Sequence, residues 1–159
     1  MKIIFAMTLI LTMKVYASDE CSKQAAEKFV QDTCSKIENS ADEKTAKSGW
    51  PQSLLFKNCG ENYIWIQETS NEIKMIMHPI KQNLNGQSLV TQKDENNFPL
   101  FVEFDKAAKK NPAGTWVEYL WPKPNSKKAT PKISYVKKCK LKNGTEWIAG
   151  SGLWKEDLK

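Results

Sequence analysis

The N-terminal third of the chain carries a helical pattern of apolar positions. Between residues 19 and 47, apolar and small side chains recur at steps of three and four residues, and Glu and Lys fill the opposite side. The recurring positions are Ala26, Phe29, Val30, Thr33, Ile37 and Ala41. Gly49 and Pro51, which both disfavour a helix, follow this segment. The pattern predicts one long amphipathic helix that Gly49 and Pro51 bring to an end.

The rest of the chain is patterned mainly as β-strands. Two runs rich in β-branched and aromatic residues, 63–67 and 73–78, are joined through Ser70-Asn71-Glu72 and predict a hairpin. Three further runs follow at 115–121, 132–141 and 146–154. The last two flank Asn143-Gly144, a dipeptide typical of a tight hairpin turn.

A crossover segment connects the second and third predicted strands. It consists of a polar stretch, 81–97, and a short amphipathic helix that begins near Pro99 and ends at Asn111-Pro112. Antiparallel strands beside segregated helices predict an α+β domain with one five-stranded antiparallel sheet. We expect the long N-terminal helix to pack on one face of this sheet. The other face, roofed by the crossover segment, is then free to form a pocket.

Residues 1–17 have the features of a signal peptide. Lys2 precedes an apolar run, 3–13, that is about half the ~20 residues needed to cross a bilayer, and Val15-Tyr16-Ala17 resembles a cleavage site. We therefore expect a mature chain that starts at Ser18 and is soluble, periplasmic or secreted, and not inserted in the membrane. Removing the leader takes away two lysines and no acid, which lowers the net charge from +6 to +4.

The four cysteines, Cys21, Cys34, Cys59 and Cys139, predict two disulfides in an exported chain. If Cys21 and Cys34 share the first helix, they lie ~20 Å apart along it, too far for a bond between them. Cys34 is thus left with Cys59 or Cys139, and the sequence does not decide between the two. A zinc site is disfavoured because no C-x-x-C occurs and the chain has one His.

Composition narrows the classes of function. With 159 residues, 40% of them apolar, the chain is the size of one globular domain. All 24 basic residues are Lys, so the bidentate phosphate and guanine contacts that Arg makes are unavailable, and we expect no nucleic-acid partner. The chain contains one His and none of the common catalytic or phosphate-binding motifs. The sequence therefore predicts a protein that is not an enzyme and needs no cofactor or metal.

The candidate chemistry lies at the ends of the middle strands. Alternation places Tyr119 and Trp121 on the same face as Val117, where they form an aromatic box. Lys132 and His78 are the candidate anion contacts, because a charge-assisted hydrogen bond gains strength in a low dielectric. Trp65 is a weaker candidate, since it is also placed to face the long helix. The full candidate set is Met77, His78, Tyr119, Trp121, Lys132, Tyr135 and Trp65.

Two other features of the strands leave alternatives open. Aromatic residues at these spacings belong to a hydrophobic core more often than to the wall of a ligand pocket. The run Ala149-Gly150-Ser151-Gly152 lies inside the last strand, where Gly usually marks the close approach of another group. The group that approaches these glycines is either a packed structural element or a ligand.

These strands resemble a single Cache domain, the extracytoplasmic sensor fold of bacterial chemoreceptors and histidine kinases. The resemblance runs from about residue 60 to 155. It implies a PAS-like strand order, a long N-terminal helix and a ligand pocket on the sheet that takes small carboxylates such as acetate, propionate, lactate or pyruvate. The matching stretches are Tyr63-Ile64-Trp65-Ile66, Met77-His78-Pro79, Leu84-Asn85-Gly86, Lys93-Asp94, Glu118-Tyr119-Leu120-Trp121-Pro122-Lys123-Pro124, Pro131-Lys132-Ile133-Ser134-Tyr135-Val136 and Trp147-Ile148-Ala149-Gly150-Ser151-Gly152.

Our hypothesis from the sequence is that residues 18–159 form one Cache domain that binds a small organic acid in the periplasm. We expect it to lack an output domain of its own and to act on a membrane receptor or kinase, with the N-terminal helix as a candidate homodimer interface. The alternatives are a periplasmic interaction or inhibitor protein without a small ligand, and a small hydrolase that uses His78.

Overall fold

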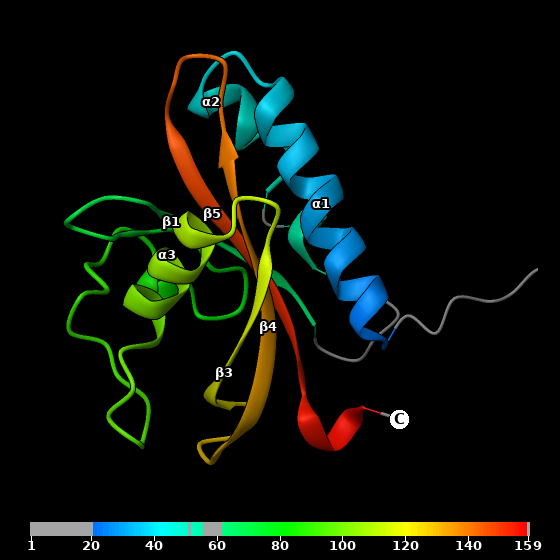
Figure 1. The fold of residues 1–159 in the computed structure, drawn as a ribbon, viewed down its shortest axis with the longest axis vertical. Helices are drawn as coiled ribbons and strands as arrows, with labels where there is room; N and C mark the ends of the chain where they lie inside the picture. The colour runs from blue at the N-terminus through cyan, green and yellow to red at the C-terminus, as the bar shows by residue number, and fades with distance from the viewer. Residues whose placement is uncertain (1–20, 51, 56–61, 159) are drawn as a thin grey trace, which may run out of the picture.

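A five-stranded antiparallel sheet separates a helix on one side from a helix and long loops on the other (Figure 1). In the computed structural model of the chain, the described residues are 21–50, 52–55 and 62–158. The predicted signal peptide and Cys59 lie outside them. Within the described ranges, none of the helices combines the length and the apolar character needed to cross a membrane.

The predicted α+β class and the five-stranded sheet are confirmed. The strand order β2-β1-β5-β4-β3 is the PAS-like order implied by the resemblance. Both predicted hairpins form, between β1 and β2 and between β4 and β5. The strands are β1 (Ile64–Glu68), β2 (Met75–Met77), β3 (Thr115–Pro122), β4 (Ala129–Lys140) and β5 (Glu146–Trp154).

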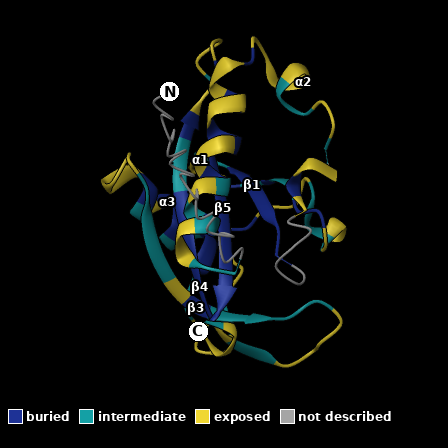
Figure 2. Cartoon of the chain, turned by 90° about the vertical axis from the view of Figure 1, so that its right-hand side faces the viewer, coloured by how far each residue is buried: buried dark blue, intermediate teal, exposed yellow. Residues whose placement is uncertain are grey.

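Helix α1 (Lys23–Asn39) covers one face of the sheet, over β4 and β5. It begins at Ser22, whose side chain accepts a hydrogen bond of 3.1 Å from the Ala25 N–H and so caps the first turn. Its apolar side is buried through Ala26, Val30 and Ile37, while its outer side is exposed (Figure 2). This arrangement agrees with the predicted amphipathic helix.

The predicted end of that helix is wrong. α1 stops at Asn39, and Ser40 is extended, with its hydroxyl donating to the Lys36 carbonyl at 2.8 Å. Asp42 then accepts a hydrogen bond of 2.8 Å from the Thr45 N–H and starts a separate short helix, α2 (Glu43–Ala46). Ser and Asp side chains compete with the helical hydrogen bonds of the backbone, and this competition breaks the segment before Gly49 is reached.

The opposite face is covered by the crossover segment, as predicted. Its helix, α3 (Leu100–Lys110), turns Phe101, Phe104 and Ala108 toward the sheet. β2 is shorter than the predicted strand and ends at Met77, before Pro79, which has no N–H for a sheet hydrogen bond. The chain then continues through the loops of the crossover segment, which lie on the side of the sheet opposite α1 (Figure 1).

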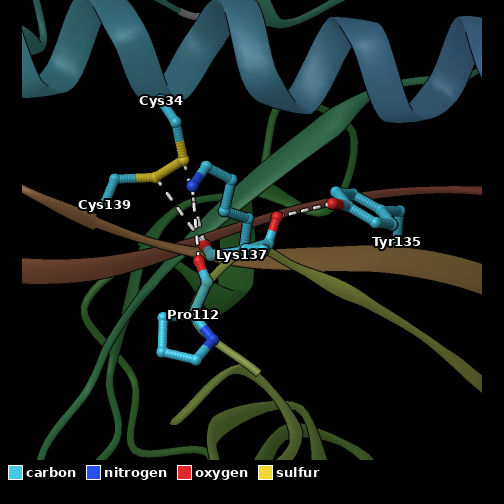
Figure 3. Close-up of a disulfide and its surroundings, with 6 residues drawn as sticks. Cys34, Pro112, Tyr135, Lys137 and Cys139 are labelled. Carbon is cyan, nitrogen blue, oxygen red and sulfur yellow. Dashed lines mark hydrogen bonds between the residues drawn. A yellow bond between two sulfur atoms is a disulfide. The ribbon is translucent and has the colours of Figure 1, made fainter. Parts of the chain in front are cut away.

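A disulfide joins the helix layer to the sheet. Cys34 of α1 is bonded to Cys139 of β4, with Cα atoms 5.2 Å apart, and both residues are fully buried (Figure 3). This bond is one of the two pairings that the sequence left open for Cys34. No described cysteine is free. Nearby on β4, the Lys137 ammonium donates to the Pro112 carbonyl at 3.3 Å.

We predict that replacing both Cys34 and Cys139 with Ala lowers the free energy of unfolding by roughly 2–5 kcal/mol. The bond restricts the conformations of a long loop in the unfolded chain, and its removal gives the unfolded state that freedom back. Urea denaturation followed by circular dichroism measures this change. Ser35→Ala, at an exposed position of the same helix, is the matched control and should leave the midpoint unchanged. A double variant as stable as the wild type would contradict the prediction.

Candidate functional site

Strand alternation sorts the candidate residues onto two faces of the sheet. Tyr119 and Trp121 lie on the α3 face together with Val117, as predicted. Lys132 is paired with Tyr119 across β3 and β4, so it shares that face. Trp65 also lies there, and its ring centroid is 5.2 Å from that of Phe104 in α3. The suggestion that Trp65 faces the long helix is therefore wrong.

Met77 and Tyr135 lie apart from this group. Both pack against the hydrophobic cluster under α1. The Tyr135 hydroxyl donates to the Ala113 carbonyl at 2.7 Å, and its ring contacts Trp116. Lys132 and Tyr135 are three positions apart on one strand, and an odd spacing puts two side chains on opposite faces. The structure thus brings together five of the seven candidates.

Lys132 is the central charged group of the α3 face. It is 1% exposed, and its ammonium lies 4.0 Å from the ring centroid of Trp154 and 4.4 Å from that of Tyr63. It donates a hydrogen bond of 3.3 Å to the Tyr63 hydroxyl. Burial, and then the charge of Lys81, hold the pKa of Lys132 well below its ordinary value, while the two ring faces favour the cation.

The Tyr63 hydroxyl links the site together. It accepts the hydrogen bond from Lys132 and a second one, of 2.8 Å, from the indole N–H of Trp121. Burial raises its pKa, so the group stays protonated and its own O–H remains a donor. The sequence analysis did not select Tyr63 as a site residue. Its position two residues before Trp65, and so on the same face, was the signal available.

His78 is held as a neutral ring. Its Nδ1 accepts hydrogen bonds from the backbone N–H groups of Ile80 and Lys81, at 3.3 and 2.9 Å. Burial, followed by the charges of Lys132 and Lys81, lowers its pKa from 6.5 to about 3. The proton of the neutral ring therefore sits on Nε2, which is a donor. The ring lies 4.6 Å from that of Tyr63, centroid to centroid.

Two glycines of β5 make room for this arrangement. The ring of Trp65 occupies the space where a Cβ of Gly150 would lie. Gly152 is crowded in the same way by the Ser134 side chain and the Ile133 carbonyl. The small run in the last strand is thus explained by close approach of neighbouring strands.

The rings leave little space between them. The cavity on this face has a volume of about 10 Å³, which is room for one water molecule. The aromatic rings pack edge to face and fill most of the space between them. The lining residues are Tyr63, Trp65, His78, Leu100, Phe101, Phe104, Tyr119 and Trp121.

This arrangement suits a small anionic group with a short apolar part. The polar groups on this face are the Lys132 ammonium, which donates to the Tyr63 hydroxyl, and the His78 ring, which lies beside the Tyr63 ring. Trp65, Phe101 and the neighbouring rings form the apolar end. Among the described residues that line the cavity, none is acidic, so no fixed negative charge opposes an anion there. Lys81 adds a second ammonium, 4.2 Å above the Trp121 ring.

Comparison with known proteins identifies relatives of the whole domain. A family model described as a Cache domain (dCache_2) matches residues 18–159. The methyl-accepting chemotaxis protein McpP of Pseudomonas putida is 35% identical over 99 residues. That alignment covers 62% of this chain and 17% of the length of McpP.

Solved structures agree with this family in fold and partly in sequence. The periplasmic sensor domain of a chemotaxis protein superposes with a TM-score of 0.64 at 31% identity, covering 83% of this chain and 89% of the other. A Cache chemosensory domain described for its recognition of carboxylic acids gives a TM-score of 0.60 at 28% identity, with coverages of 83% and 87%. A methyl-accepting chemotaxis protein of Vibrio parahaemolyticus, 20% identical with a TM-score of 0.61, shares the fold.

We predict that His78 makes the folded state less stable in acid. The unfolded chain protonates this ring near pH 6.5, whereas the folded protein keeps it neutral to about pH 3. Between these values the unfolded state binds the extra proton, so the free energy of unfolding falls by up to about 1.4 kcal/mol for each pH unit lowered. Urea denaturation between about pH 7 and 4 measures the slope.

His78→Asn is the matched variant for this experiment, because an amide oxygen can accept from the same backbone N–H groups and does not titrate. The difference in slope between the wild type and this variant isolates the imidazole from the carboxyl groups that titrate in the same range. Equal slopes would show that the ring is protonated in the folded protein.

Proposed function

The chain belongs to the Cache domain family, and on that premise we propose that it is a periplasmic sensor module that binds a short carboxylate. The observation that carries this proposal is the buried ammonium of Lys132, which faces two aromatic rings and a hydroxyl. A buried cation is costly unless an anion or several dipoles compensate it. A carboxylate is the kind of ligand that would complete this site.

The relatives support the choice of ligand class. One of the similar solved structures is a Cache chemosensory domain that recognises carboxylic acids. The donors in this chain match that chemistry, because a carboxylate has two oxygens that accept only. One oxygen would bind the Lys132 ammonium and the Tyr63 hydroxyl, and the other the His78 Nε2–H. The apolar remainder would lie against Trp65 and Phe101.

Binding requires the rings to separate, because the closed cavity holds about one water molecule. Trp121 is the partly buried ring of the set, and it packs between His78 and Phe101. Its movement with the crossover segment would open space beside Lys132. A ligand-dependent change of tryptophan fluorescence would accompany that movement.

The site supports binding rather than catalysis. Cache sensor domains are ligand-binding modules, and the pKa of about 3 leaves His78 a poor base at neutral pH. This argues against a hydrolase that depends on His78. We further propose that residues 1–17 direct the chain to the periplasm, where a disulfide such as Cys34–Cys139 is stable and where a related sensor domain acts. A membrane receptor or kinase is the proposed recipient of the signal.

We predict saturable binding of propionate to the mature protein and at least a tenfold loss of affinity in Lys132→Met. Met keeps the volume and removes the ammonium, whose charge-assisted hydrogen bond is worth roughly 1.5–3 kcal/mol. Isothermal titration calorimetry, repeated with acetate, lactate and pyruvate, measures the affinities. Lys128→Met, in the exposed β3–β4 loop, is the control.

If none of these acids binds the wild type, the carboxylate proposal fails and the alternative of an interaction protein without a small ligand takes its place. If they bind with equal strength to the wild type and Lys132→Met, the ligand lies elsewhere than at Lys132.

Removal of single tyrosine hydroxyls should show which face of the sheet binds the ligand. Tyr63→Phe takes away a donor to the ligand and the acceptor of Lys132 and Trp121, and we expect a loss of affinity of about three- to tenfold. Tyr135→Phe removes a hydroxyl under α1 and should leave affinity unchanged. The same titrations measure both variants. A larger loss in Tyr135→Phe than in Tyr63→Phe would place the site on the α1 face.

A further inference from the structure

A larger hollow lies beside the closed cavity, at the outer edge of β3. We call it the edge cleft. It has a volume of about 480 Å³ and is open to solvent. Its lining residues come from the crossover segment, β3, the start of β4 and the turn that follows β5: Asp94, Asn96, Phe98, Glu118, Tyr119, Leu120, Pro131, Lys132 and Lys155. Two of them, Tyr119 and Lys132, belong to the proposed ligand site.

Tyr119 separates the two spaces. Its side chain is 8% exposed and lines both the edge cleft and the closed cavity. Lys132 lines the cleft from the same side and is paired with Tyr119 in the sheet register. A shift of the Tyr119 ring would therefore join the open space to the closed one next to the ammonium.

Resting on the proposed carboxylate-binding function, we propose that the edge cleft is the entrance through which small anions reach Lys132, and that Tyr119 is the door between cleft and cavity. Ser134 is then the positioning residue that keeps the door closed. Its hydroxyl is hydrogen-bonded to that of Tyr119 at 2.9 Å, and it lines neither space.

The outer wall of the entrance is fixed to the sheet. One carboxylate oxygen of Asp94 accepts from the backbone N–H groups of Asn96 and Phe98, at 2.9 and 3.0 Å. The other accepts from the Leu120 N–H on the edge of β3, at 2.9 Å. Asp94 thus pins the crossover segment beside β3 and holds the mouth in place while the door moves.

The charged residues that line the edge cleft do not repel an anion. The two acids of the lining are already engaged: Asp94 by three backbone N–H groups, and Glu118 by the Lys155 ammonium at 2.6 Å. Lys155 stands at the mouth and Lys132 at the inner end. An anion that enters here would pass two acidic groups whose charges are already neutralised by their partners and would then approach the buried Lys132 ammonium.

A bulky side chain at the mouth tests the route by kinetics. Asn96 is exposed, and Asn96→Trp places a large ring there without touching the ligand site. An obstacle at an entrance slows entry and exit by the same factor. Stopped-flow fluorescence with propionate should therefore show association and dissociation rates that both fall at least fivefold, with an unchanged dissociation constant.

Asn71→Trp, at the exposed turn between β1 and β2, is the matched control and should leave both rates unchanged. The entrance is elsewhere if Asn96→Trp leaves both rates at their wild-type values. A changed dissociation constant with an unchanged exit rate would mean that the cleft is itself a binding site, which also overturns the proposal.

Ser134→Ala tests the door. Loss of the hydrogen bond should raise both rates at least threefold, whereas a purely structural role of Ser134 would alter stability and leave the rates alone. Wild-type rates in this variant would remove the door from the proposal.

A chemical probe keeps the proposal testable if no carboxylate binds. Cyanate adds to the uncharged form of an amine, and peptide mass spectrometry gives the rate at Lys132 relative to exposed Lys28. We expect Asn96→Trp to slow the reaction at Lys132 at least fivefold and to leave Lys28 unchanged. Equal rates at Lys132 in the wild type and the variant would exclude the edge cleft as the route. Failure of propionate binding together with a slowed cyanate reaction would refute the ligand and keep the entrance.

Discussion

The structure depends on one demanding interaction, the burial of the Lys132 ammonium among aromatic rings. Its compensation comes from two ring faces and one hydroxyl. The cation lies on β4, and its two partners come from other parts of the sheet, Tyr63 from just before β1 and Trp154 from the end of β5. Each must keep its position for the cation to remain stabilised. Stabilisation of the Lys132 ammonium therefore requires the observed order of the central strands.

The two faces of the sheet differ in the interactions that their side chains make. Under α1, apolar side chains and the disulfide give stability through ordinary packing. On the α3 face, polar groups of aromatic residues form hydrogen bonds with one another, as the indole N–H of Trp121 does with the Tyr63 hydroxyl. Gly150 lets the Trp65 ring pack directly on the sheet there.

Local patterns were sufficient for much of this structure. Alternation and the Asn143-Gly144 turn predicted β5 with its observed limits and put Tyr119 and Trp121 on one face. The meeting of Lys132 with Tyr63 and Trp154 depends on the register between strands that are distant in sequence, and no local pattern encodes it. The end of α1 was missed because the apolar period continues to Ala41, while the competing Ser40 and Asp42 bonds act on single residues.

The closure of the cavity was also beyond local inference, because it results from the mutual fit of rings on β1, β3 and α3. The sequence predicts which residues share a face of the sheet, but it does not give the distances between their side chains. Trp65 shows the point: its face of the sheet became clear through its contact with Phe104 and its place over Gly150.

The Cys34–Cys139 bond has a mechanical meaning for such a domain. Lys132 and Cys139 lie on the same strand, seven residues and about 23 Å apart along it. The covalent tie prevents α1 from sliding over β4 at that point. Any tilt of β4 that begins at Lys132 would therefore move α1 together with the strand, and the outer surface of α1 would change its position with it.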